Sequence, residues 1–263
     1  MYSLRIATEQ SITPADAGHR FSSVAAETLS ERITRQLVES IVLGHYRPGD
    51  FLPTEDELCQ QLGVSRPVVR EAAKALSMLG MIRSRQGRGT EVLAYESWNE
   101  LAPEILRARR DLDLAEDFLV DLLVVRRTVE VEAAALAAEH ATPADLGAMA
   151  RFLEEAEEVG NDAEAFARVD VDFHDAILAA TGNRPLRSLL RMIEPTLLAA
   201  RIASLASRPD GTKRSLREHR AIYRAINAGS AADAREAMAT HLSWTANLSA
   251  GELAGRGRTR GAR

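Results

Sequence analysis

Hydrophobic side chains recur every three or four residues over most of the chain, which is the spacing of one face of an α-helix. The first such stripe contains Ile33, Leu37 and Ile41 and ends at Gly44. A much longer region, residues 114–248, keeps the same spacing, interrupted only by short breaks rich in glycine and proline, and shows no strand-like alternation. The pattern therefore predicts a mainly helical protein.

The stretch 52–93 is divided by residues that typically begin or end short helices. Thr54 and Glu57 have the spacing of a capping box, which predicts that a helix begins at Thr54. Gly63 ends that helix, and Ser65 is a suitable N-cap for the next one. Two short helices joined by a tight turn are thus expected here.

A β-hairpin is predicted after the second short helix. Residues 81–85 and 90–93 can pair as strands, because Gly87 and Gly89 between them permit the backbone angles of a tight tip. With the preceding helices, this hairpin completes the pattern of a winged helix-turn-helix domain, which we place at residues 23–94.

Positive charge gathers on this domain, although the whole chain has a formal net charge of −5. The simplest explanation of this positive charge is a basic face exposed to solvent. The charge occurs together with the predicted helix caps, turn, second helix and hairpin, and this combination favours contact with nucleic acid phosphates. The positive residues are Arg66, Arg70, Lys74, Arg83, Arg85 and Arg88.

The rest of the chain divides by composition. Residues 95–113 read as a connecting helix and 114–250 as an antiparallel bundle of about six to seven helices. Residues 1–22 and the basic, glycine-rich 251–263 read as flexible tails. The single cysteine, the lack of a signal peptide and the lack of a long apolar run favour an intracellular protein.

Four residues in the bundle have side chains suited to a metal ion. Asp170 and His174 lie four apart, so they share one helix face, while His219 and His241 stand on the last two predicted helices. A carboxylate and three imidazoles can converge on a divalent transition metal inside a bundle. The alternative is that these histidines are ordinary packing or surface residues.

The N-terminal motifs resemble those of the GntR family of bacterial transcription regulators. They are Gly44, Pro48-Gly49, Leu52-Pro53-Thr54-Glu55, Val64-Ser65-Arg66, Val69-Arg70-Glu71 and Gly87-Arg88-Gly89-Thr90. The resemblance implies that Arg66 and Arg70 contact operator bases and that the wing tip enters the minor groove. The expected DNA-binding residues are Thr54, Ser65, Arg66, Arg70, Lys74, Gln86, Gly87 and Arg88. One position departs, because the family usually has a DNA-contacting arginine where this chain has Asp56.

The helical region is similar to the FCD domain of the FadR-like branch of that family. Metal-binding FCD domains carry their ligands in a DxxxH, an EHR-like and a late HL segment, and Asp170, His174, His219 and His241 match all of them. The resemblance thus implies a divalent metal, with zinc expected first and nickel or manganese as alternatives. Arg126 resembles an arginine near the family's ligand, so we expect Arg126 and Glu130 to bind the effector. Their alternative role is a surface or domain-contact ion pair.

These resemblances predict a DNA-binding regulator and not an enzyme. We expect a cytoplasmic, nucleoid-associated homodimer that represses a catabolic operon and leaves a palindromic operator when a small organic acid binds. Trp98-Asn99 after the wing resembles the branch of the family that responds to sugar acids, which implies a sugar acid as the effector. Three alternatives stay open at this point: a sensor of the metal itself, a metal-dependent hydrolase, and an acyl-CoA-responsive regulator. The intact ligand set argues against the last.

Overall fold

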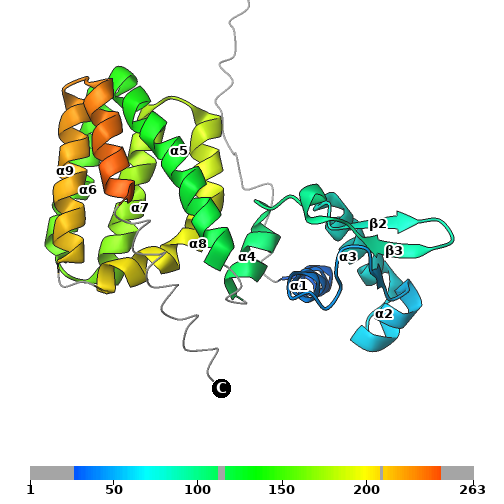
Figure 1. Ribbon diagram of the computed structural model, residues 1–263. Helices are drawn as coiled ribbons and strands as arrows, with labels where there is room; N and C mark the ends of the chain where they lie inside the picture. The colour runs from blue at the N-terminus through cyan, green and yellow to red at the C-terminus, as the bar shows by residue number, and fades with distance from the viewer. Residues whose placement is uncertain (1–26, 112–115, 208–209, 244–263) are drawn as a thin grey trace, which may run out of the picture.

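The computed structural model describes residues 27–111, 116–207 and 210–243, so the tails predicted at 1–22 and 251–263 lie outside the described residues. Figure 1 shows two lobes, with a small sheet in one and long helices in the other. The prediction of a mainly helical protein with a winged helix-turn-helix and a helical C-terminal domain is confirmed. Among the described residues, no helix is both long enough and apolar enough to cross a membrane.

The N-terminal lobe is the winged helix-turn-helix. Its elements are α1 (Leu29–Val42), β1 (Phe51–Leu52), α2 (Glu55–Leu62), α3 (Arg66–Met78), β2 (Ile82–Arg85) and β3 (Gly89–Val92). The sheet is antiparallel in the order β1-β3-β2. The hairpin was predicted, but β1 was not, because two residues are too few to show an alternating pattern.

Local chemistry sets the helix boundaries in this lobe. Thr54 forms the expected capping box with Glu57, and Gly63 ends α2 in the left-handed conformation at a φ of 65°. Ser65 does occupy the N-cap of α3, but its hydroxyl makes no capping hydrogen bond. Gly80 also has a positive φ, and a β-carbon there would lie 2.0 Å from the Ser97 carbonyl oxygen, so only glycine fits.

Helix α4 (Pro103–Asp111), which follows the short 3-10 turn η1 (Tyr95–Ser97), packs against the N-terminal lobe. Trp98, Ile105 and Ala108 share one hydrophobic core with residues of α1 and α3. The indole Nε1 of Trp98 donates a hydrogen bond to the Leu93 carbonyl at 3.0 Å. The core of the N-terminal lobe therefore includes side chains well beyond the wing.

The C-terminal lobe is a helical bundle. It consists of α5 (Glu116–His140), α6 (Pro143–Val159), α7 (Ala163–Ala180), α8 (Arg184–Ala206), α9 (Gly211–Asn227) and a helix over residues 231–243. One core cluster contains α6, α7 and α9, and a second joins α5, α7 and α8 to Leu106 of α4. Helix α4 thus contributes to the cores of both lobes.

Candidate metal centre and DNA-binding surface

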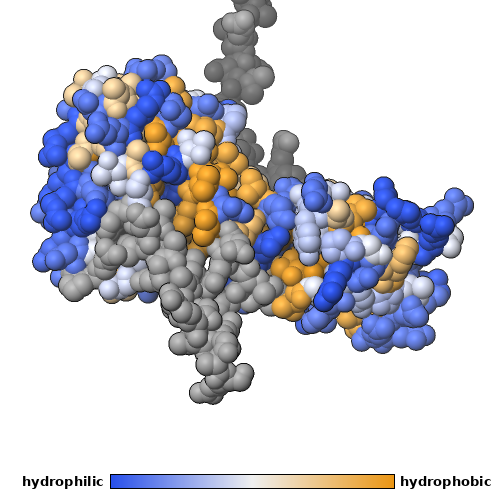
Figure 2. Space-filling model, viewed as in Figure 1, coloured by the Kyte–Doolittle hydropathy of each residue, from blue (hydrophilic) through white to orange (hydrophobic). Residues whose placement is uncertain are grey.

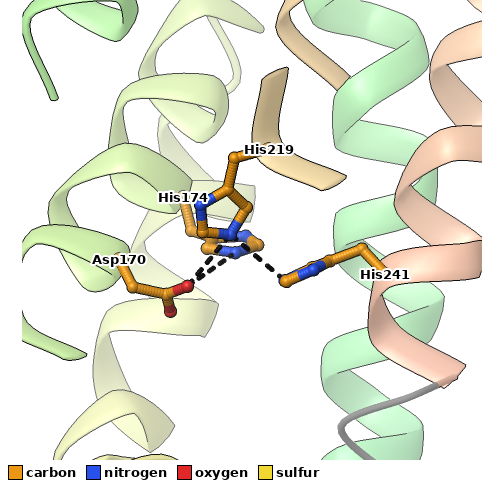
Figure 3. A group of neighbouring side chains, drawn as sticks. All are labelled: Asp170, His174, His219 and His241. Atoms are coloured by element: carbon orange, nitrogen blue, oxygen red, sulfur yellow. Dashed lines mark hydrogen bonds and ion pairs between the residues drawn. The ribbon is translucent and has the colours of Figure 1, made fainter. Parts of the chain in front are cut away.

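The four predicted metal ligands converge in the middle of the bundle. Asp170 and His174 project from one face of α7, His219 comes from α9, and His241 comes from the helix over 231–243. All four side chains point toward one another in Figure 3. One ligand atom from each lies within 4.8 Å of the others, and every one of the four residues is buried.

The distances place the imidazole Nε2 atoms and one carboxylate oxygen around a common point. Asp170 Oδ1 lies 3.0 Å from His219 Nε2 and 3.9 Å from His174 Nε2. The Nε2 atoms of His219 and His241 are 3.3 Å apart. Three imidazole nitrogens and a carboxylate oxygen are a donor set that zinc and related ions accept.

Carboxylates behind the histidines orient two of the rings. Glu130 on α5 is an ion-pair partner of His174 Nδ1, and Glu218 Oε2 on α9 lies 3.0 Å from His241 Nδ1. A proton held at Nδ1 leaves the lone pair of Nε2 directed at the centre, as metal-binding histidines require. The sequence did not single out Glu218 for this role, although it is the first residue of the Glu218-His219-Arg220 segment.

Two buried arginines complete the surroundings. Arg126 Nε lies 2.7 Å from Glu130 Oε1, and both side chains are at most 3% exposed. The ion pair that was the alternative role of these residues therefore does form, but it is buried and does not lie at the surface. Arg201 on α8, which sequence reasoning missed, lies with Nε 2.8 Å from Asp170 Oδ2 and with Nη1 2.9 Å from Glu194 Oε1. Nothing in the periodicity of α8 distinguishes Arg201 from its exposed arginines.

The protonation states in the centre favour metal binding. Burial lowers the pKa of His241 to about 3, and His219 adds to this effect. Burial also lowers the pKa of His219, more than the nearby Asp170 raises it. Burial raises the pKa of Asp170, but Arg201 and His219 outweigh it and hold that pKa well below its usual range. Near neutral pH these groups are therefore two neutral imidazoles and a carboxylate, the forms that bind metal.

The pKa of His241 predicts a pH dependence for the metal-free protein. Its folded pKa lies below the unfolded value, so its contribution is complete above about pH 6.5 and is lost as the pH falls. Each pH unit between about 6.5 and 3 should cost about 1.4 kcal/mol for this histidine, and hence about 2 kcal/mol by pH 5.

Urea unfolding of the chelated protein at pH 7.5, 6.5 and 5.0 measures this loss. His219 should add to it in the same direction. Carboxylates with lowered pKa values contribute only below about pH 4.5, outside this interval. An unfolding free energy that is constant from pH 7.5 to 5.0 would contradict the lowered pKa values of His219 and His241.

The residues expected to bind DNA all lie on the exposed surface of the N-terminal lobe. They are Thr54, Ser65, Arg66, Arg70, Lys74, Gln86, Gly87 and Arg88. The hydroxyl of Thr54 is engaged in the capping box of α2, accepting from Glu57 N and donating to its carboxylate. Two arginines of α3 form exposed ion pairs, Arg66 with Asp56 and Arg70 with Glu55. The structure thus places one basic helix and the wing tip at the surface.

Comparison with known proteins agrees with both lobes. Residues 29–92 match the model for bacterial regulatory proteins of the gntR family, and residues 121–243 match the FCD domain. The HTH-type transcriptional regulator LutR of Bacillus subtilis (strain 168) is 34% identical over 203 residues, covering 76% of this chain and 91% of LutR. The galactonate operon transcriptional repressor of Escherichia coli (strain K12) is 32% identical over 197 residues, covering 75% and 86% of the two chains.

A solved structure shows the same fold at low identity. It is that of Lar, which controls the expression of the Listeria monocytogenes agr system, with a TM-score of 0.57, 18% identity, and coverage of 85% of this chain and 97% of Lar. The winged helix-turn-helix and these relatives define a DNA-binding transcriptional regulator. The chain belongs to the GntR family, in its FadR-like branch with an FCD domain. Because the family consists of regulators, the hydrolase alternative is set aside.

Proposed function

We propose that this protein is a homodimeric repressor of a catabolic operon, released from a palindromic operator when a small organic acid binds beside a metal in the FCD domain. The proposal places the protein in the cytoplasm, where chromosomal DNA lies. The observation that carries it is a buried four-ligand centre bordered by a cationic side chain with unused hydrogen-bonding capacity. Such a group suits an anion that also approaches the metal.

Asp170, His174, His219 and His241 would hold the ion. Their mixed nitrogen and oxygen donors fit zinc first, and nickel or manganese next. When bound, the ion supplies a Lewis-acidic position for a carboxylate oxygen. Glu130 and Glu218 fix the ring orientations, and Arg201 holds the second oxygen of Asp170.

A small cavity adjoins the centre and supports an acid as the ligand. Its volume is about 20 Å³, and its wall includes the ligands Asp170 and His241. The polar groups that line the rest of it come from Arg126, Arg201, Ser204 and Ser215. Among the described residues, Arg201 Nη2 and Ser204 Oγ have no hydrogen-bond partner. A guanidinium and a hydroxyl are donors that a carboxylate accepts from.

The size of this cavity supports coupling between ligand and conformation. A volume of about 20 Å³ holds a single water, so an organic acid requires the wall to open. Arg201 and Ser204 belong to α8, and α8 shares a core cluster with Leu106 of α4. Movement of α8 would therefore reach α4, which packs on the DNA-binding lobe. Differential affinity for the two arrangements, typically about 1–3 kcal/mol, would release the operator.

The surface of α5 supports the homodimer. Val120 and Val124 lie one turn apart on this helix and are 41% and 59% exposed. Figure 2 shows hydrophobic side chains gathered over the same part of the bundle. An exposed apolar face on a long helix suits a second copy of the chain. Two copies would present two α3 helices to the two half-sites of a palindrome.

Thermal melting with a panel of acids tests the effector. The protein is melted as purified, after chelation and after zinc is restored, with sugar acids, hydroxy acids, dicarboxylates and amino acids. Because a relative is a galactonate operon repressor, galactonate is the first sugar acid to include. An acid at about a hundred times its dissociation constant should add nearly 3 kcal/mol, which raises the melting temperature by several degrees.

The metal dependence of that shift decides between two functions. If one acid stabilises only the metal-loaded protein and also releases operator DNA, the proposed function stands. If metal stabilises strongly and no acid adds to it, the acid-responsive function is wrong. The second candidate function, a regulator that responds to the metal itself, would then replace it. The burial of all four candidate ligands favours this second candidate.

A further inference from the structure

Asp56 forms an ion pair with α3, the helix that carries the arginines expected to contact DNA. It lies in the first turn of α2, and its carboxylate faces Arg66, the first residue of α3. Arg66 Nη2 lies 2.8 Å from Asp56 Oδ1 and 3.0 Å from Asp56 Oδ2. Both side chains are more than half exposed, at 60% and 58%, so the pair stands on the surface that is expected to meet DNA.

The geometry of the pair leaves part of Arg66 free. Both carboxylate oxygens of Asp56 engage the same nitrogen, Arg66 Nη2. Among the described residues, no hydrogen bond involves Nη1 or Nε of Arg66. Reading a guanine takes two N–H donors directed at its O6 and N7 atoms. Asp56 therefore fixes the guanidinium without using all of its donors.

The neighbouring arginine shows the same arrangement. Arg70 donates from Nε to Glu55 Oε2 at 2.9 Å, which leaves its two terminal nitrogens available. Two consecutive acids of α2 thus hold two arginines of α3, one turn apart, from the side of the preceding helix. An arginine that is already held in one orientation loses less side-chain freedom when it binds a base.

We propose that Asp56 is a specificity-determining residue of operator recognition, which positions Arg66 for one guanine in each half-site and weakens binding to DNA of other sequences. The second effect follows from charge, because a carboxylate on this surface repels phosphate wherever no guanine contact compensates for it. The inference rests on the proposed role of Arg66 as a base-contacting residue.

The experiment uses the full-length, metal-loaded protein and a library of randomised DNA duplexes. Wild type, Asp56→Asn, Arg66→Ala and Glu132→Gln are each selected on the library, and their affinities are then measured on the selected site, on single-base variants of it and on a scrambled duplex. Glu132→Gln is the matched control, since it removes one negative charge and one exposed ion pair, with Arg235, in the other lobe.

Asp56→Asn should reduce the preference for guanine about tenfold at one base pair of each half-site, with scrambled DNA bound more tightly. Its melting temperature should stay that of wild type, because an exposed ion pair contributes little to stability. Arg66→Ala should lose preference at the same base pair, and Glu132→Gln should match wild type.

The outcomes distinguish failure of the role of Asp56 from failure of the base-contacting role of Arg66. If Arg66→Ala changes the base preference and Asp56→Asn leaves it intact, or shifts the affinity for all sequences equally, the role of Asp56 is overturned alone. If Arg66→Ala leaves every preference intact, the base-reading role of Arg66 fails and the role of Asp56 fails with it.

Discussion

Replacing His174 by alanine is expected to abolish binding of the proposed metal and to lower the melting temperature by about 10 °C. A metal at about a thousand times its dissociation constant adds about 4 kcal/mol to the stability of the native state. For a chain of this size each kcal/mol corresponds to about 2–4 °C. His174 is central to this effect, because it supplies one of the four converging ligand atoms and is itself oriented by Glu130.

The matched control is His140→Ala, which removes an exposed histidine at the end of α5 in the same lobe. Metal content per chain is measured by atomic absorption, and each variant is melted before and after chelation. The control should keep its metal and its chelation-dependent shift. Full metal occupancy in His174→Ala would show that the four residues are not the ligand set.

Replacing Arg70 by alanine should weaken operator binding by a factor of about 30 to 20,000, because a bidentate arginine contact discriminates by about 1–3 kcal/mol and the proposed dimer would lose two of them. The free protein should be affected little, since Arg70 is exposed and its pair with Glu55 lies at the surface. Fluorescence anisotropy with a labelled operator duplex, at several salt concentrations, measures the change.

Arg151→Ala removes an exposed arginine from α6 and serves as the control for charge. Its operator affinity should equal that of wild type at each salt concentration. A base contact and a phosphate contact are distinguished by the scrambled duplex, for which Arg70→Ala should lose much less affinity. An equal loss on both duplexes would restrict Arg70 to a phosphate contact.

Sequence spacing predicted the two short helices of the winged helix-turn-helix because the boundaries of α2 have local chemical causes. Thr54 with Glu57, and Gly63, fix the start and end of α2 through contacts within a few residues. The strand β1 escaped prediction because its existence depends on pairing with Glu91 and Thr90, about forty residues away. Local signals reveal local structure, and a two-residue strand has no signal of its own.

The same distinction applies to the candidate metal centre. The i, i+4 spacing of Asp170 and His174 assigned them to one helix face. The two distant histidines were grouped with them as candidate ligands, and the resemblance to metal-binding FCD domains strengthened that hypothesis. Periodicity alone did not reveal that Arg201 on α8 contacts Asp170. That contact depends on how two helices pack, and an arginine in an amphipathic helix is usually exposed.

Because α4 packs into both lobes, its position limits where domains can be exchanged between regulators. Ile105 and Ala108 belong to the core of the DNA-binding lobe, while Leu106, between them, belongs to that of the bundle. A chimera joined just after the wing would deprive the donor lobe of Trp98 and Ile105. A junction after Asp111 would keep that lobe whole but would replace the partners of Leu106 with foreign side chains. The junction between the two lobes is therefore a single helix whose side chains must pack against both of them.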